Sequence, residues 1–456
     1  MLKKWFFLDF IFVLFLALSS FILFLDDIDA FPYLISLVSF YLVLAAYIRQ
    51  GFYSFHFLFS VSFVLFNSSR YILDFGGGGN VREIIYFANY IMDSSAYTTQ
   101  SVCLLAFLFC ILFFVNIDRR ELKLFKYLHL THVQKIALLF TFLFSMMFQV
   151  YKVKILLSLG EGGGYIDFQR DYEHYITMVP AIVRYFSYFF PISFFAILTS
   201  VRVNENVFKL ISILYLIVLA YTTSLGGRAL FFTSLLILIW LYGRLYCKKT
   251  VTISWLLLMS LGALFLLGLG QLVVANRMGD SGPSISMVIP LVLYDQGTSI
   301  TVFSLMYKNM DVVFSFNVLF EHLLRYIYMP FGGGLSALGF RADISSFVEV
   351  MAKSIDPTSV EIGYGLGGNL MAELYLYFHL FSVFIFYGLL KLYRRIGDIS
   401  GGGYFYLLVP ISMQSILFSP RSYAFDFLID VGRNFIYVIF LTFFLLMIKA
   451  ISSSSK

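Results

Sequence analysis

Charged residues are scarce in this chain of 456 amino acids. Only 13% of its residues are Asp, Glu, Lys or Arg, whereas roughly a quarter are charged in an ordinary soluble protein. So few charges do not cover the surface of a water-soluble chain of this length. The scarcity therefore excludes a soluble globular protein.

Cysteine and basic clusters are also rare. Of the three cysteines, Cys103 and Cys110 lie inside an apolar run and Cys247 lies beside a pair of lysines. This spacing contains neither a disulfide framework nor a CxxC metal motif. The net charge is only +6 and no basic run stands out from its surroundings. Nucleic acid is therefore not an expected partner.

Hydrophobic residues are abundant instead, at 60% of the chain. A helix needs about 20 apolar residues to cross a bilayer, and the chain contains about twelve such runs. Barrel strands alternate polar and apolar residues, whereas these runs are apolar on all sides, so a β-barrel is excluded. The sequence predicts an all-α polytopic membrane protein. The expected spans are residues 5–25, 31–48, 52–67, 99–116, 136–157, 178–199, 207–224, 229–246, 251–274, 368–390, 403–419 and 427–448.

The distribution of Lys and Arg predicts the orientation. With both termini in the cytoplasm, the inner loops carry most of the lysines, as the positive-inside rule requires. The first span follows Lys3 and Lys4 and lacks a cleavage site, so it is expected to be an uncleaved anchor. The whole chain, 1–456, is then one integral domain of the bacterial inner membrane. Its long extracytoplasmic loop, 275–367, is inserted before the last three spans and is expected to contain short helices, among them Phe316–Met329.

The outer side is rich in arginine, where arginines outnumber lysines. The planar guanidinium group suits bidentate contacts with phosphate, so an anionic ligand is expected there. Arg228 is the strongest single candidate because Gly226 and Gly227 permit close backbone approach. The other candidates are Arg277, Arg325, Arg341, Arg421 and Arg433. An equally simple interpretation pairs four of them with nearby acids: Arg277 with Asp280, Arg325 with Glu321, Arg341 with Asp343, and Arg421 with Asp426.

Ionisable residues at membrane depth are functional candidates because they are costly to place there. Glu373 shares a helix face with Asn369 and Tyr377, whereas His379 points elsewhere and is interpreted as a packing residue. Arg184 is a further charge at membrane depth. For Arg433, an ion pair with Asp430 competes with ligand binding. An Asp27-Ile28-Asp29 triplet in the first outer loop resembles a D-x-D metal motif, although such a triplet is more often a solvated loop.

Two motifs carry a resemblance to a known family. The first is Gly226-Gly227-Arg228 before an apolar span. The second runs from Pro357-Thr358 to Gly367-Gly368-Asn369-Leu370-Met371-Ala372-Glu373-Leu374-Tyr375. Together with the topology and a Tyr328-Met329-Pro330 segment, they make the whole chain resemble the bacterial O-antigen polymerases, also called oligosaccharide repeat-unit polymerases. The chain departs from the family pattern at Tyr377-Phe378-His379, where Phe-Gly often follows the tyrosine.

The resemblance implies a GT-C-like membrane enzyme that joins undecaprenyl-diphosphate-linked oligosaccharide repeat units at the periplasmic face. It also implies a chain-length regulator as a partner. Arginines are expected to stabilise the departing diphosphate, and no cofactor or metal is expected. Glu373 is the first choice for the general base and His322 the second, with Glu361 and Asp295 as further candidates. Tyr294, Tyr326, Tyr328 and Tyr364 are candidates for stacking on sugars, and Tyr364 is also assigned to the substrate site.

Three other functions stay open at this stage. A metal-dependent glycosyltransferase with a lipid-phosphate sugar donor would use the Asp27 and Asp29 pair. A flippase or another transporter of lipid-linked oligosaccharides is less favoured, because the chain shows no matching halves. An O-antigen ligase would share the architecture and the donor. The Gly-Gly-Arg and Glu-x-Tyr motifs favour the polymerase.

Overall fold

The computed structural model describes residues 14, 28–77, 81–84, 90–117, 129–160, 171–200, 203–223, 225, 229–246, 290, 293–337, 346–357, 367–399 and 403–454. These residues form a helical bundle, with one antiparallel pair of two-residue strands. The predicted all-helical class is therefore confirmed. Two predicted spans, 5–25 and 251–274, lie outside this part of the chain, apart from residue 14.

The elements follow one another along the chain with short connections. The first half contains η1 (Ile28–Ala30), α2 (Phe31–Gln50), α3 (Phe55–Asn67), α4 (Ser69–Phe75), β1 (Glu83–Ile84), β2 (Tyr90–Ile91), α5 (Ser94–Ile117), α6 (His132–Leu159), α8 (Tyr172–Met178), α9 (Ala181–Ser200), α10 (Glu205–Thr223) and α11 (Ala229–Tyr246). The second half contains η2 (Gly297–Ile300), α14 (Thr301–Lys308), α15 (Met310–Val313), α16 (Phe316–Ala337), α17 (Phe347–Ile355), α19 (Leu370–Phe378), η3 (His379–Phe381), α20 (Ser382–Asp398), η4 (Tyr404–Leu407), α21 (Leu408–Phe418), η5 (Ser419–Arg421) and α22 (Asp426–Ser454).

Within the described residues, seven helices are long and apolar enough to cross a membrane. They are Phe31–Gln50, Ser94–Ile117, His132–Leu159, Ala181–Ser200, Glu205–Thr223, Leu370–Asp398 and Asp426–Ser452. Each coincides with a predicted span within several residues. Helices α3 and α11 are shorter apolar helices, and the predicted span 403–419 is divided into η4 and α21. At 1.5 Å per residue, the 11 residues of α21 extend only about 17 Å, which is less than the hydrocarbon thickness.

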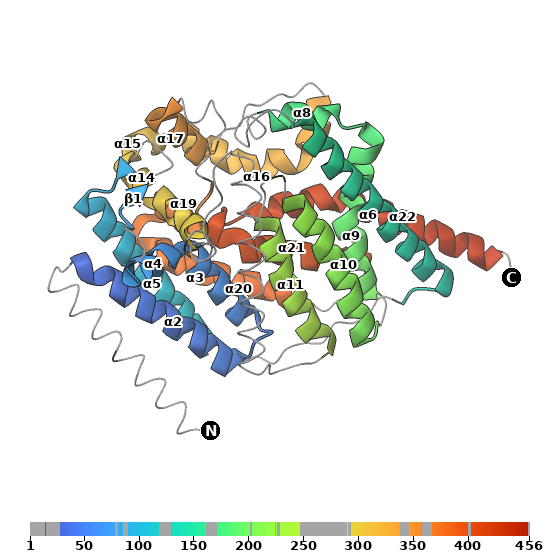
Figure 1. The fold of residues 1–456 in the computed structure, drawn as a ribbon, viewed down its shortest axis with the longest axis horizontal. Coiled ribbons are helices and arrows are strands. Elements are labelled where there is room, and N and C mark those ends of the chain that lie inside the picture. The colour runs from blue at the N-terminus through green and yellow to red at the C-terminus, as the bar shows by residue number, and fades with distance from the viewer. Residues whose placement is uncertain are drawn as a thin grey trace.

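Hydrogen bonds gather the predicted inner ends of the spans at one end of the bundle. The contacts are Gln50 Nε2 to Val115 O (2.7 Å), Gln134 Nε2 to Leu445 O (2.8 Å), Tyr246 Oη to Val203 O (2.8 Å), and Arg244 Nη1 to Gly397 O. The basic loops predicted to face the cytoplasm therefore share one end. Helices α6, α9, α10 and α11 run side by side away from it, and α16 lies across the opposite end (Figure 1). The first turns of α19 and α22 are also at that opposite end.

The segment 275–367, predicted as a long outer loop, contributes helices to the core. Helix α14 packs against α5 and α19, and its Val302, Phe303 and Leu305 are fully buried. Helix α16 includes the predicted 316–329 helix and packs against α22 and α17. This part of the chain is therefore built into the bundle and supplies residues to its interior.

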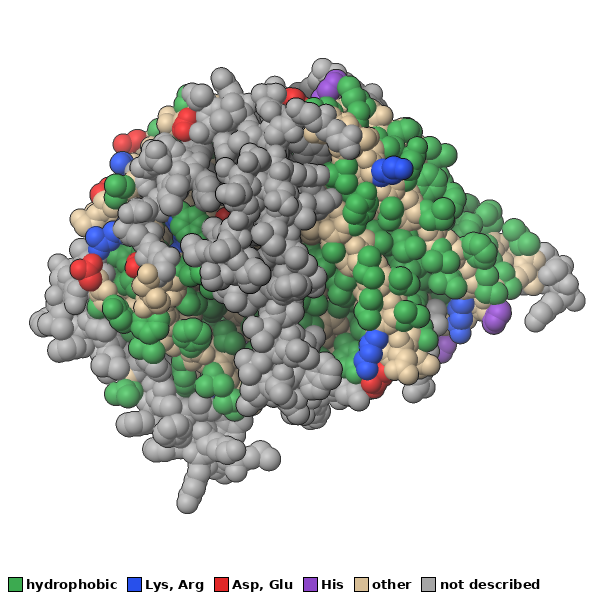
Figure 2. All heavy atoms as spheres, viewed as in Figure 1, with side chains coloured by type: hydrophobic (Ala, Val, Ile, Leu, Met, Phe, Trp, Pro, Cys, Tyr) green, Lys and Arg blue, Asp and Glu red, His purple; other side chains and the backbone are tan. Residues whose placement is uncertain are grey.

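Apolar side chains cover the side of the molecule formed by α6, α9 and α10, with charged side chains at its margins (Figure 2). Phe140 on α6 is 70% exposed, and Leu210 on α10 is 60% exposed. Large apolar side chains exposed in a continuous band suit contact with lipid. The surface therefore agrees with a protein that crosses a bilayer.

Candidate active site

The site begins at the amino end of α19, where Asn369 caps the helix. Its Oδ1 accepts the N–H of Ala372 at 2.9 Å, and its Nδ2 donates to Asn67 Oδ1 and to Ser299 O, both at 2.9 Å. An N-cap Asn satisfies an amide that the helix leaves without a partner. Here the same side chain also ties α19 to α3 and η2. The following turn is thereby held in a fixed position, and it carries Glu373.

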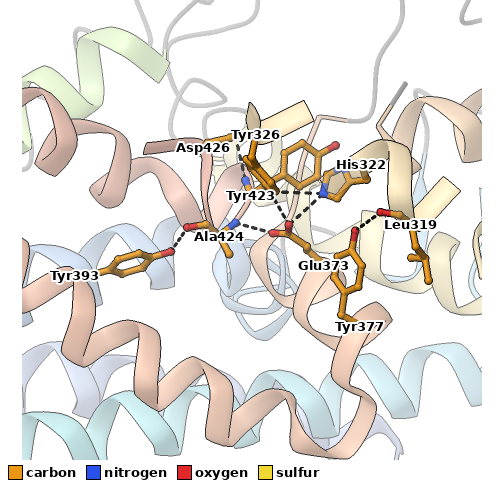
Figure 3. A network of polar contacts seen from close by, with 9 residues as sticks. All are labelled: Leu319, His322, Tyr326, Glu373, Tyr377, Tyr393, Tyr423, Ala424 and Asp426. Carbon is orange, nitrogen blue, oxygen red and sulfur yellow. Dashed lines mark hydrogen bonds and ion pairs between the residues drawn. The ribbon is translucent and has the colours of Figure 1, made fainter. Parts of the chain in front are cut away.

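Glu373 is enclosed by three other segments of the chain (Figure 3). Its Oε1 lies 3.0 Å from His322 Nε2 and accepts a 2.5 Å hydrogen bond from the Tyr326 hydroxyl. Its Oε2 accepts the backbone N–H of Ala424 at 2.6 Å. Only 2% of the Glu373 side chain is exposed. A buried carboxylate is costly unless it is hydrogen bonded, and both oxygens of Glu373 have donors.

His322 lies in a box of aromatic rings. Its ring centre is 4.7 Å from that of Tyr423, 5.1 Å from Phe347, 5.5 Å from Tyr326 and 6.1 Å from Tyr377. None of its side chain is exposed. Tyr377 is fixed in turn by donating from its hydroxyl to Leu319 O at 3.1 Å. This enclosure holds the imidazole in one orientation relative to Glu373.

The hydrogen bond to Glu373 assigns the tautomer of His322. A carboxylate accepts, so Nε2 carries the proton and Nδ1 carries the lone pair. The buried Nδ1 makes no hydrogen bond within the part of the chain that the structure describes. A histidine oriented by a carboxylate, with its other nitrogen unused, has the arrangement of a general base.

One charged residue adjoins this pair. The guanidinium carbon of Arg325 lies 4.8 Å from the ring centre of Tyr423, and its positive charge acts on Asp426. The predicted partner of Arg325 was Glu321, but among the described residues its nearest interactions are with Tyr423 and Asp426. Arg325 Nη1 is buried and makes no hydrogen bond there. This arginine therefore has donor capacity left for an anionic group.

The two tyrosines beside Glu373 stay protonated. Burial raises the pKa of Tyr326, and the negative charges of Glu373 and Asp426 raise it further. Burial also raises the pKa of Tyr423. Since both phenols keep their protons at neutral pH, Tyr326 acts as a donor to the Glu373 carboxylate.

The other predicted site residues are separated from this cluster. Arg421 donates from Nη1 to Gln296 Oε1 and lies over the ring of Phe66, and does not pair with Asp426 as one interpretation expected. Arg433 is exposed on α22, and its charge acts on Asp430, as the ion-pair interpretation anticipated. Arg228, Arg277, Arg341, Tyr364 and Glu361 lie outside the described residues.

Two residues near Arg421 bear on earlier candidates. Asp295, a candidate base, adjoins the buried Arg70, whose guanidinium carbon is 4.1 Å from the ring centre of Tyr294. Asp29 of the D-x-D triplet is 3.1 Å from Arg82 Nη2. Neither acid contributes to the Glu373 cluster.

The sequence did not indicate Tyr423 or the Ala424 amide as parts of the site. Both stand in the short segment between η5 and α22, and nothing in their local pattern distinguishes them from other connecting residues. Arg70 was also missed, although a buried arginine at the end of an apolar run is a usable signal. Their roles follow from contacts between residues about 50 or more positions apart.

Comparison with known proteins decides the family. The family described as O-antigen polysaccharide polymerase Wzy matches residues 6–455, which is nearly the whole chain. The chain belongs to this family. The resemblance seen in the sequence is thereby confirmed, and the chain is a polymerising enzyme of O-antigen biosynthesis in the bacterial inner membrane. Comparisons with curated proteins and with solved structures found no match.

Proposed function

We propose that this O-antigen polymerase joins undecaprenyl-diphosphate-linked oligosaccharide repeat units, and that His322 and Glu373 form its catalytic pair. The observation that carries this proposal is the 3.0 Å contact between His322 Nε2 and Glu373 Oε1, which leaves Nδ1 available. The order of preference between the two residues is thereby reversed. Both oxygens of Glu373 are engaged, so His322 removes the proton and Glu373 orients it.

The reaction requires a balanced displacement at one carbon atom. The acceptor hydroxyl oxygen attacks C1 of the reducing-end sugar of the growing glycan, and its proton passes to His322 Nδ1. The bond between C1 and the diphosphate oxygen breaks, and its electron pair leaves with the lipid diphosphate. Glu373 stabilises the imidazolium that forms. Arg325 offers a positive charge to the departing diphosphate.

The remaining arginines extend this proposal. We assign Arg228, Arg277, Arg341, Arg421 and Arg433, with Tyr364, to the wider diphosphate and substrate region, of which Arg325 is the member beside the catalytic pair. Tyr326 and Tyr423 present aromatic rings beside His322, where an acceptor sugar would stack. The imidazole is fully buried, so the acceptor reaches Nδ1 only when a covering side chain moves aside.

The membrane arrangement supports the same site. We propose twelve spans in a GT-C-like arrangement, both termini in the cytoplasm, and 275–367 as a periplasmic insertion. The basic loops share one end of the bundle, and the Glu373 cluster lies at the other. The positive-inside rule then places the cluster at the periplasmic face, where a chain-length regulator would also dock.

Reconstitution with a lipid-diphosphate repeat unit tests the proposal. Wild-type protein in detergent is expected to produce a ladder of polymers with and without EDTA. His322→Ala is expected to remove the ladder, while His379→Ala, a histidine outside the cluster, is expected to keep it. A ladder that persists in His322→Ala would refute the catalytic pair. Transfer to lipid A-core without a ladder would indicate the ligase, and a ladder lost in EDTA would indicate the metal-dependent enzyme.

A further inference from the structure

A second polar cavity lies apart from the Glu373 cluster. Its volume is about 510 Å³, and six helices line it: α6, α9, α10, α11, α21 and α22. Its polar lining includes Gln149, Lys152, Gln414, Asp430 and Asn434. A cavity of this size is within the range of small-molecule sites. Polar side chains gathered among membrane helices mark a functional site more often than a structural one.

Lys152 gives this cavity its charge. Its Nζ lies 4.9 Å from the ring centre of Tyr188, and the positive charge of Arg184 on α9 acts on it. Neither Lys152 nor Arg184 makes an ion pair with an acid within the described residues. Two neighbouring cations at membrane depth repel each other unless an anion lies near them. The arrangement therefore suits a phosphate group.

Amides and hydroxyls line the rest of the cavity. Gln149 Nε2 donates to Thr222 Oγ1 at 3.3 Å, and Gln414 Nε2 donates to Ser234 Oγ at 2.8 Å. Asn434 Nδ2 donates to Asp430 O at 2.7 Å. The oxygens of these three amides accept no hydrogen bond from the part of the chain that is described. They are available to the hydroxyl groups of a sugar.

An apolar groove of about 860 Å³ adjoins the polar cavity. It is formed by α6, α9 and α22 and is lined by side chains such as Phe144, Phe189 and Phe440. The two cavities meet at a pair of rings, because Tyr188 lines the cavity, Tyr437 lines the groove, and their ring centres are 5.5 Å apart. Phe440 is 60% exposed, so the groove is open on the lipid side.

The groove and the cavity are stacked along α6. The groove covers Ala137 to Ser145, and Lys152 is seven residues farther from the basic end. At 1.5 Å per residue, the groove spans about 12 Å and the ammonium group lies about 10 Å beyond it. A lipid whose head is at the periplasmic end and whose tail extends into the bilayer has this polarity.

We infer that this cavity and groove bind one lipid-linked glycan by its phosphate, its first sugar and the start of its hydrocarbon chain. Lys152 contacts the phosphate, the three amides contact sugar hydroxyls, and the aromatic groove holds the chain. This inference rests on the proposed function, because it seats one of the two lipid-linked substrates that a polymerase needs. Asp426 and Asp430 are one turn apart on α22, so this seat adjoins the catalytic cluster along the same helix.

Binding measurements on the purified full-length protein in detergent test the inference. The probes are undecaprenyl diphosphate, undecaprenol and inorganic diphosphate, and the readout is the dissociation constant by thermophoresis. Undecaprenyl diphosphate is expected to bind most tightly. Lys152→Gln is expected to weaken its binding about tenfold or more, as loss of a charge-assisted contact does, and to leave undecaprenol unchanged. Lys152→Arg is expected to preserve binding, which separates charge from folding.

The groove is tested separately. Phe440→Ala is expected to weaken both lipids about threefold to tenfold through lost apolar contact and to leave inorganic diphosphate unchanged. Lys209→Gln and Phe384→Ala are the matched controls, because each changes the same residue type at an exposed position on α10 or α20. Both controls are expected to bind all probes as the wild type does.

Three results would overturn the inference: Lys152→Gln binding as Lys209→Gln does, inorganic diphosphate binding as tightly as the lipid, or undecaprenol binding as tightly as its diphosphate. The catalytic pair is judged independently, since Glu373→Gln is expected to retain lipid binding and to lose the polymer ladder. Loss of the ladder in His322→Ala together with normal binding in Lys152→Gln would refute only the lipid seat.

Discussion

The backbone N–H of Ala424 donates a 2.6 Å hydrogen bond to Oε2 of Glu373, across 51 positions of sequence. This bond joins the segment before α22 to the first turn of α19. The Tyr393 hydroxyl donates to the carbonyl of the same Ala424. Both sides of one peptide unit are therefore fixed, and Glu373 is held in place by main chain as well as by side chains.

Gly368→Ala is expected to disturb this bond. A Cβ atom at Gly368 would lie 3.0 Å from the Cα and carbonyl carbon of Ser422, two residues before Ala424. Because backbone atoms yield less readily than a side chain, the segment must shift, which costs about 1–3 kcal/mol as overpacking does. A lower Tm in detergent and a weaker polymer ladder are the measurements. Gly388→Ala is the control, since a Cβ there meets nothing within 4 Å. Equal Tm values for the two variants would contradict the prediction.

Tyr326→Phe is expected to leave Glu373 Oε1 with only His322 as a donor. Loss of a hydrogen bond to a buried charged group costs about 1.5–3 kcal/mol, so stability is expected to fall by that order, together with the polymerisation rate. Thermal unfolding and initial rates measure the two effects. Tyr33→Phe is a matched control because that side chain is 57% exposed. Unchanged stability in Tyr326→Phe would show that the hydroxyl contributes little to the carboxylate.

Asn369→Ala is expected to destabilise α19 by more than the loss of a cap alone. A cap is worth about 0.5–2 kcal/mol, and this side chain also donates to Asn67 and Ser299. Asn204→Ala is the comparison, since Asn204 Oδ1 accepts the N–H of Val207 at 2.8 Å at an exposed helix start. A double-mutant cycle with Asn67→Ala measures the added coupling. Additive effects would rule out a contribution from the bond between the two asparagines.

The three described arginine candidates are expected to differ in their effect on rate. Arg325→Ala is expected to lower the rate of polymerisation about 10²-fold to 10³-fold, as removal of a group that stabilises developing charge does. Arg421→Ala should have a smaller effect because Arg421 contacts Gln296 and Phe66. Arg433→Ala should have the smallest, because Arg433 is exposed on α22. Initial rates with one lipid-linked repeat unit give the order. An effect of Arg433→Ala equal to that of Arg325→Ala would contradict it.

The spans could be predicted from the sequence because a bilayer selects a local property. Any helix that crosses it must present about 20 apolar residues in succession. The described helices α2, α5, α6, α9 and α10 therefore begin and end within a few residues of the predicted positions. The Gly367-Gly368-Asn369 cap before α19 was readable for the same reason, since a helix start depends on its own residues.

The pairing of the catalytic candidates was decided only by the tertiary structure. Glu373 and His322 were predicted as alternatives, because the sequence contains no local signal that α16 lies beside the first turn of α19. Their roles depend on which nitrogen and which oxygens are already bonded, and those bonds come from Tyr326 and Ala424. Composition determined that this protein spans a membrane, since transfer into lipid is a sum over local residues. Packing between distant helices determined which of its few buried charges face one another.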